Sequence, residues 1–181
     1  MRAVCMFTML HLAMACTNFM VSPGASADGS AIMSYSCDGP SFAALTHYPP
    51  RAPGTKRQLK RKGCSEEGAS RGEIEVATET FNTVGLTNEH SVAIGETTFG
   101  GIHFLRGTGS LTYYDVMELA LQTSKTAREM IAAINKLVTT HGYGGTENVT
   151  EGGGWGTGES FTIADTKEVC LFVVGIVAFN P

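Results

Sequence analysis

The sequence predicts a mixed α+β fold, and three observations support this class. Glycine accounts for 22 of the 181 residues, which favours a loop-rich or β-rich fold over a helical bundle. Segments of alternating β-branched residues lie before residue 100, whereas apolar residues recur at helical spacing between residues 114 and 142. The length and a hydrophobic content of 43% suit one domain with its own core.

The first fifteen residues resemble a removable leader. Arg2 precedes an almost unbroken apolar run that is too short to span a bilayer, and the run ends in the small-x-small pattern Ala13-Met14-Ala15 that signal peptidases accept. The alternatives are a buried N-terminal strand or helix, and a lipoprotein signal, for which Leu12 lies one position too far upstream. We expect residues 1–15 to be a signal peptide, and the protein to be secreted or to reach an endomembrane or lysosome-like lumen.

A β-hairpin is predicted directly after this leader. A short apolar run at 19–21 is followed by Asp28-Gly29, and a second apolar run begins at residue 31. Asp-Gly between two apolar runs is a strong short-range hairpin signal. We therefore expect Cys16 to open the first strand of an antiparallel pair.

Residues 48–72 predict an exposed loop. Three prolines remove hydrogen-bond donors from any strand ladder, and the like charges of the basic run 56–62 repel one another. An anion-binding or nucleic-acid-binding patch is the alternative for this run, which lacks interleaved aromatic residues. The net charge of −4 gives no reason to expect a nucleic-acid partner.

Strands are predicted again from residue 73, and helices from residue 114. The segments 73–86 and 91–101 alternate and are rich in β-branched residues. A first helix is expected near Tyr114 with Asp115 as its N-cap, and the capping-box pattern from Thr126 to Glu129 starts a second helix. Gly142 can end this second helix. Its core-facing stripe comprises Met130, Ile131, Ile134, Leu137 and Val138.

The last forty residues combine a glycine-rich loop with two apolar strands. The loop at 142–158 is no phosphate loop, because no Lys-Ser/Thr pair follows its glycines. It contains Asn148-Val149-Thr150, so Asn148 is a glycosylation candidate if the chain enters a eukaryotic secretory route. Residues 160–164 are expected to form a strand, and residues 170–179 form a further apolar run.

The cysteines and histidines give no metal-binding pattern. No C-x-x-C pair, zinc-type spacing or H-E-x-x-H motif is present, so no metal or cofactor is expected. The position of Cys16 is more informative, because cleavage before it frees an α-amine next to its own thiol. An α-amine has a pKa of about 7.7–8.0 and a cysteine thiol about 8.5, so the amine can act as the base for the thiol. The alternative is a small buried cysteine at the start of a strand.

Four segments, in the expected order, resemble the N-terminal-nucleophile cysteine dipeptidases (dipeptidase A-like), which are related to penicillin V acylases, bile salt hydrolases and secernins. These segments are residues 16–30, 85–98, 119–129 and 158–165. The resemblance implies an αββα four-layer sandwich with antiparallel sheets and a leader whose removal exposes the cysteine. It also implies hydrolysis of dipeptides or short peptides through an acyl-enzyme.

The resemblance also implies roles for single residues. Cys16 matches the nucleophile, and Asp38 matches a carboxylate that orients the α-ammonium, although it also suits a turn before Gly39. Asn88 matches an oxyanion-hole donor, a contribution of roughly 2.7–4 kcal/mol in the transition state, or else it is an asparagine of a strand-linking turn. Tyr35, a candidate substrate-binding residue, stands where many relatives have Arg; a phenol donates a hydrogen bond but carries no fixed positive charge.

Relatives are several hundred residues long, and a later segment brings another Asn and an Arg into their site. Here the resemblance fades near Cys170, where relatives usually have Trp, and the sequence ends at Pro181. We therefore expect residues 16–181 to be the N-terminal part of such a domain, poorly soluble or oligomeric and inactive alone. The alternatives to a dipeptidase are an amidase or acylase of the same fold, a non-catalytic remnant, and a basic-loop binding protein. The expected partners are short peptides and, in a homo-oligomer, a second copy of the chain, with no nucleic acid and no stable membrane span.

Overall fold

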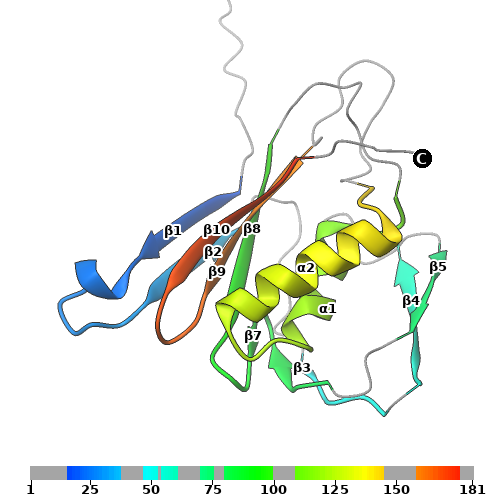
Figure 1. Cartoon of the computed structure of the whole chain (residues 1–181), viewed down its shortest axis with the longest axis horizontal. Coiled ribbons are helices and arrows are strands. Elements are labelled where there is room, and N and C mark those ends of the chain that lie inside the picture. The colour runs from blue at the N-terminus through cyan, green and yellow to red at the C-terminus, as the bar shows by residue number, and fades with distance from the viewer. Residues whose placement is uncertain are drawn as a thin grey trace, which may run out of the picture.

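The computed structural model describes residues 16–37, 47–52, 54–60, 70–75, 80–99, 109–144 and 158–175. Within these ranges, strands dominate the first half and two helices separate β8 from β9 (Figure 1). The elements are, in order, β1 (Thr17–Val21), a 3-10 turn (Pro23–Ala25), β2 (Ile32–Ser36), β3 (His47–Tyr48), β4 (Lys56–Lys60), β5 (Ser70–Glu75), β6 (Thr83–Val84), β7 (Thr87–Asn88), β8 (Ala93–Phe99), α1 (Tyr113–Leu121), α2 (Ala127–His141), β9 (Gly158–Ala164) and β10 (Val169–Gly175).

A six-stranded sheet lies at the centre of the molecule, with the strand order β10-β9-β8-β7-β6-β3. All of its pairings are antiparallel. The two longest ladders join β9 to β8 and to β10, and the first runs from Ala93 opposite Ala164 to Phe99 opposite Gly158. Strand β8 lies within the predicted strand 91–101, β9 covers the predicted strand 160–164, and β10 overlaps the apolar run that begins at Cys170. Residues 100, 101 and 176–179 lie outside the described ranges. The antiparallel sheets with two helices confirm the predicted α+β class.

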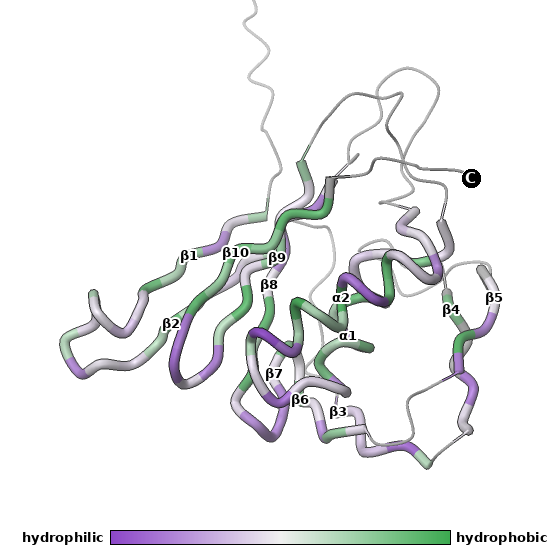
Figure 2. The backbone as a smooth tube through the Cα atoms, viewed as in Figure 1, coloured by the Kyte–Doolittle hydropathy of each residue, from purple (hydrophilic) through white to green (hydrophobic). Residues whose placement is uncertain are grey.

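The two helices cover one face of this sheet, where α1 contacts β8 and α2 contacts β9 and β10. Met130 and Ile134 of the predicted helical stripe are fully buried in the core that this contact forms. The other three stripe residues pack against that core while partly buried. Hydrophobic stretches run along α1 and along β8 to β10 in Figure 2, as expected for elements that share one core. No helix in the described ranges is both long and apolar enough to cross a membrane.

The predicted hairpin is present as β1 and β2, which pair from Thr17 opposite Ser36 to Val21 opposite Ile32. It packs against β8 and β9 on the face of the sheet away from the helices (Figure 1). Ile94 belongs to the helix-covered core, whereas a Cβ added at the next residue, Gly95, would collide with side chains of the hairpin. Successive strand residues point to opposite faces, so the described layers are helices, six-stranded sheet and hairpin.

The prediction of an exposed loop throughout residues 48–72 is wrong in part. Lys56–Lys60 forms β4, which pairs antiparallel with β5. Leu59 and Ile74 are buried at 2% and 5% exposure and belong to the main core. One buried apolar residue, Leu59, anchors this short strand to the core. The prediction gave more weight to the basic residues around it. Residues 61 and 62 lie outside the described ranges.

The N-terminal residues of the two helices differ in part from the prediction. Thr112, not Asp115, is the N-cap of α1: Asp115 Oδ2 accepts from the Thr112 amide at 3.1 Å, and Thr112 Oγ1 accepts from the Asp115 amide at 3.4 Å. Asp115 is therefore the third helical residue of a capping box. Thr126 is the N-cap of α2, as predicted, and Oγ1 accepts from the Glu129 amide at 3.1 Å. The Glu129 carboxylate, however, accepts from the amide of Lys125 at 2.7 Å.

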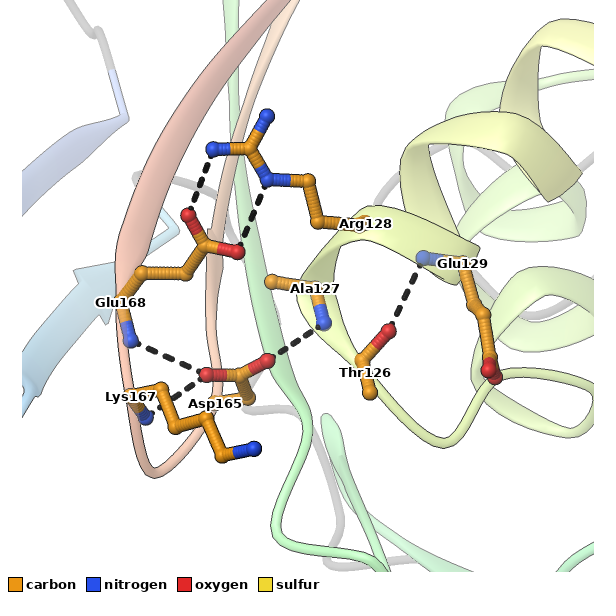
Figure 3. A network of polar contacts seen from close by, with 7 residues as sticks. All are labelled: Thr126, Ala127, Arg128, Glu129, Asp165, Lys167 and Glu168. Carbon is orange, nitrogen blue, oxygen red and sulfur yellow. Dashed lines mark hydrogen bonds and ion pairs between the residues drawn. The ribbon is translucent and has the colours of Figure 1, made fainter.

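A polar network fixes the start of α2 to the turn between β9 and β10 (Figure 3). Asp165 Oδ2 accepts from the Ala127 amide at 2.8 Å, which satisfies a donor that the helix itself leaves unpaired. Asp165 Oδ1 accepts from the amides of Lys167 at 2.8 Å and Glu168 at 3.0 Å. Arg128 makes two hydrogen bonds to the Glu168 carboxylate, at 2.9 and 2.8 Å. The helical layer is thereby connected to the sheet at the turn between β9 and β10.

Candidate active site

Cys16 lies immediately before β1, where the sequence places it, and it is half-buried. Its thiol donates to Glu96 Oε1 on β8 at 3.2 Å. Its carbonyl oxygen accepts from Thr97 Oγ1 at 3.5 Å. Both its side chain and its backbone therefore fix the start of the hairpin against β8.

The hairpin brings two further side chains to the same place. Tyr35 donates to Glu96 Oε1 at 2.6 Å, and its hydroxyl lies 3.9 Å from the sulfur of Cys16. The sulfurs of Cys16 and Cys37 and a carboxylate oxygen of Glu96 all lie within 4.8 Å of one another. The register explains this, since the step beyond Thr17–Ser36 brings Cys16 opposite Cys37. Tyr35 is two residues before Cys37 and shares its face.

Asn18 fixes the hairpin to the central sheet. Its Nδ2 donates to the carbonyl oxygen of Glu96 and to Thr97 Oγ1, each at 2.6 Å. Its Oδ1 accepts from Thr162 Oγ1 at 2.8 Å. Asn18 of β1 is thus hydrogen-bonded to both β8 and β9. These bonds, in addition to the direct contact, hold Cys16 close to Glu96.

Two carboxyl groups are buried close to each other, and one of them, that of Glu96, contacts the thiol. Glu96 and Glu159 are each 1% exposed, and Thr98 Oγ1 lies 3.3 Å from Glu96 Oε2 and 2.8 Å from Glu159 Oε1. Burial, and next the charge of Glu96, raise the pKa of Glu159 well above its usual range, so Glu159 is neutral at pH 7. Burial, and next Glu96, also raise the pKa of Tyr35, so its phenol remains a hydrogen-bond donor.

Asn88 is buried and fully hydrogen-bonded to the backbone. Its Nδ2 donates to the carbonyl oxygens of Leu121 at 2.8 Å and Ser124 at 2.7 Å. Its Oδ1 accepts from the amides of His90 and Val92, both at 3.0 Å. These contacts are those of the strand-linking-turn alternative. The oxyanion-hole role of Asn88 stays a prediction, and no contact between Asn88 and the Cys16 cluster supports it.

Other predicted residues lie outside the described ranges, namely the leader 1–15, Asp38 and the glycosylation candidate Asn148. Their roles stay predictions. Sequence reasoning missed four members of the site: Asn18, Cys37, Glu96 and Glu159. Two signals were present: Cys37 shares the alternation of Tyr35, and Glu96 and Glu159 are charges within otherwise apolar or β-branched strands.

The family comparison covers the central part of the chain. The model of "Peptidase family C69" matches residues 43–172, which is more than half of the sequence and includes Asn88, Glu96 and Glu159. Cys16 and Tyr35 precede the matched range. No curated protein and no solved structure matches significantly. The chain belongs to peptidase family C69, and this membership makes it a cysteine-type peptidase.

Proposed function

We propose that the protein is a cysteine dipeptidase, which hydrolyses short peptides through an acyl-enzyme on Cys16. The observation that carries this proposal is the placement of the Cys16 thiol, 3.2 Å from a buried carboxylate and at the first residue after the expected leader. Membership of a cysteine-type peptidase family supports the reaction class. The preference for dipeptides rests on the resemblance of residues 16–30 to mature dipeptidases.

The proposed chemistry begins with removal of residues 1–15, which frees the α-amine of Cys16. This amine takes the thiol proton, and the sulfur then attacks the scissile carbonyl carbon of the peptide. The proton passes to the departing amine, which leaves a thioester on Cys16. Water then hydrolyses the thioester and releases the acid. In this scheme the Glu96 carboxylate orients the sulfur, and Tyr35 holds that carboxylate in place.

Two further roles come from the resemblance and are part of the same proposal. Asp38 orients the α-ammonium group. Asn88 donates to the oxyanion when substrate is bound, which requires one Nδ2 donor to leave its bond to the carbonyl oxygen of Leu121 or Ser124. The leader is proposed to direct the chain to a secretory route, in which the mature enzyme is secreted or retained in an endomembrane lumen.

The test measures covalent labelling of the thiol, because labelling needs only a competent nucleophile and not a complete catalytic cycle. A dipeptide chloromethyl ketone is added to the processed chain, and the adduct is located by peptide mass spectrometry, with N-terminal sequencing in parallel. We expect a mature N-terminus at Cys16 and one adduct on its sulfur. Cys16→Ser should abolish the adduct, whereas Cys170→Ser, which changes another partly buried thiol, should leave it unchanged.

Turnover is measured on the same samples with a dipeptide panel and an acylated-amine panel. Where wild type hydrolyses dipeptides, Cys16→Ala should lower kcat by about 10⁴-fold or more, as loss of a catalytic nucleophile does. Labelling of a different cysteine, or a mature chain that starts beyond Thr17, would contradict the assignment of Cys16. Turnover of acylated amines alone would favour the amidase alternative.

A further inference from the structure

We propose that Cys16, Cys37 and Glu96 form a binding site for a thiophilic divalent cation of the Zn²⁺ class, and that the bound cation blocks Cys16 as a nucleophile. The binding part of this inference stands on the geometry alone. Its inhibitory part rests on the proposed function of Cys16. Cys16 directly precedes β1, Cys37 directly follows β2, and Glu96 lies on the central strand β8.

The distances between the ligand atoms suit a tetrahedral ion. Zn–S and Zn–O bonds of about 2.3 and 2.0–2.2 Å place neighbouring ligand atoms about 3.6–3.8 Å apart. The three atoms here all lie within 4.8 Å of one another, and the Cys16 sulfur is 3.2 Å from Glu96 Oε1. Small side-chain adjustments would therefore bring all three to bonding distance. The fourth position is open to water, or to the α-amine that leader removal creates on Cys16.

The fold holds one of these ligands on a paired strand and the other two directly beside paired strands. Cys16 and Cys37 face each other across the open end of the hairpin, one register step beyond Thr17–Ser36. Glu96 lies on a strand paired with β9 along its length, and its carboxylate is oriented by the Tyr35 hydroxyl at 2.6 Å. Hydrogen bonds of this kind to a ligating carboxylate typically fix its orientation and strengthen the site.

Charge also favours a cation here. Glu96 is 1% exposed, and within the described part of the chain it forms no ion pair with Lys, Arg or His. A buried carboxylate is costly without a compensating charge. Two sulfur ligands select Zn²⁺ and similar ions over Mg²⁺ or Ca²⁺, which prefer oxygen ligands. On binding, each thiol releases its proton to solvent and coordinates as a thiolate.

The experiment titrates the full chain, fully reduced, with Co²⁺ as a spectroscopic probe and then with Zn²⁺ as competitor. Thiolate coordination gives Co²⁺ an intense near-ultraviolet charge-transfer band. We expect one equivalent of Co²⁺ to produce this band, and one equivalent of Zn²⁺ to remove it. Because the two sulfurs lie within 4.8 Å of each other, the reduced state is verified by mass before each titration.

Variants distinguish this site from adventitious binding. Cys37→Ser and Glu96→Gln should each weaken Co²⁺ binding by about tenfold or more, since losing an outer-shell partner of a ligand already costs about 10–100-fold. Cys170→Ser should bind like wild type. Cys37→Ser changes one atom near the end of the described hairpin, so it tests the site even if Glu96→Gln does not fold. An unchanged affinity in Cys37→Ser, or absence of the thiolate band in wild type, would overturn the proposal.

The blocking effect has its own readout. Stoichiometric Zn²⁺ should protect Cys16 from alkylation by iodoacetamide in wild type, and should give much less protection in Cys37→Ser. Unprotected Cys16 in metal-loaded wild type would overturn the blocking role. A thiolate band without peptide-directed labelling of Cys16 would refute the proposed function and leave the metal site intact. Labelling without the band would refute the metal site alone.

Discussion

At the scale of single residues, the site converges on one oxygen atom, Oε1 of Glu96. This oxygen accepts hydrogen bonds from both the Tyr35 phenol and the Cys16 thiol. An arginine at the position of Tyr35 would supply a permanent charge and several donors there. Tyr35 supplies one neutral donor instead. The interaction is therefore short and directional, and it places Glu96 without compensating its charge.

Replacing Tyr35 with Phe should show how much the placement of Glu96 depends on the tyrosine hydroxyl. The change removes the donor and leaves a buried carboxylate oxygen with one partner fewer, at an expected cost of about 1–3 kcal/mol in the free energy of unfolding. Glu96→Gln measured alone and together with Tyr35→Phe completes a double-mutant cycle. We expect a coupling energy of about 0.5–3 kcal/mol from denaturant unfolding. A coupling near zero would show that the 2.6 Å contact contributes nothing to stability.

The residues of the site divide according to what sequence can show. Sequence alone identifies Cys16 as a candidate, because it follows the expected leader, and Tyr35, because of the family resemblance. The proximity of Cys37 and Glu96 does not, because Cys16 and Glu96 are 80 positions apart and their contact depends on how the hairpin packs on β8. For Asn88 the motif predicts a role in catalysis, which stays a prediction, whereas its contacts in this structure are with the backbone.

At the scale of elements, polar side chains determine where the helices begin. Thr112 and Thr126 cap α1 and α2 from the residue directly before each helix. In addition, Asp165 in the β9–β10 turn accepts a hydrogen bond from the Ala127 amide in the first turn of α2. The strand and helix periods were visible in the sequence because apolar residues repeat along each element. The first cap was misplaced by three residues, since both Thr and Asp suit the position. The strand β4 was missed because its basic residues dominated the pattern.

Asp165→Asn should destabilise the junction between α2 and the β9–β10 turn. Burial alone would raise the pKa of Asp165, but the amides of Ala127, Lys167 and Glu168 outweigh it and hold the pKa below its usual value. Asn keeps one oxygen but presents an NH₂ group to amide donors, so we expect a loss of about 1.5–3 kcal/mol at pH 7. Chemical denaturation monitored by circular dichroism measures this loss.

The pH dependence of this effect has a definite sign. A depressed pKa stabilises the fold above the unfolded value of about 3.9, and this contribution is lost as pH falls through the folded-state pKa. The difference between wild type and Asp165→Asn should therefore be constant near neutrality and shrink below about pH 4. Glu168→Gln serves as the control, since it breaks the exposed pair with Arg128 and should lower the free energy of unfolding much less than Asp165→Asn does. Equal losses for both variants would rule out the special role of Asp165.

At the scale of the whole molecule, the described layers leave apolar side chains on two outer surfaces. Phe19 and Ile32 lie on the outer face of the hairpin, with 69% and 49% exposure. Leu171 and Val173 lie on one face of β10, with 58% and 53% exposure. Within the described residues, β10 pairs only with β9, and β1 pairs only with β2. Strand edges and apolar patches of this kind favour association with another chain.

We expect the protein to self-associate through the outer face of the hairpin, and Phe19→Ser to weaken this association. Burial of a phenylalanine side chain contributes about 1.5–3 kcal/mol, which corresponds to a change of about tenfold or more in the dissociation constant. Because Phe19 is mostly exposed, its replacement should leave the free energy of unfolding nearly unchanged. Ser34→Ala is the matched control, since Ser34 lies opposite Phe19 on the same face but carries little apolar surface. Sedimentation velocity over a range of concentrations measures the effect. A wild-type protein that stays monomeric, or equal association in Phe19→Ser, would show that this face does not mediate contact between copies.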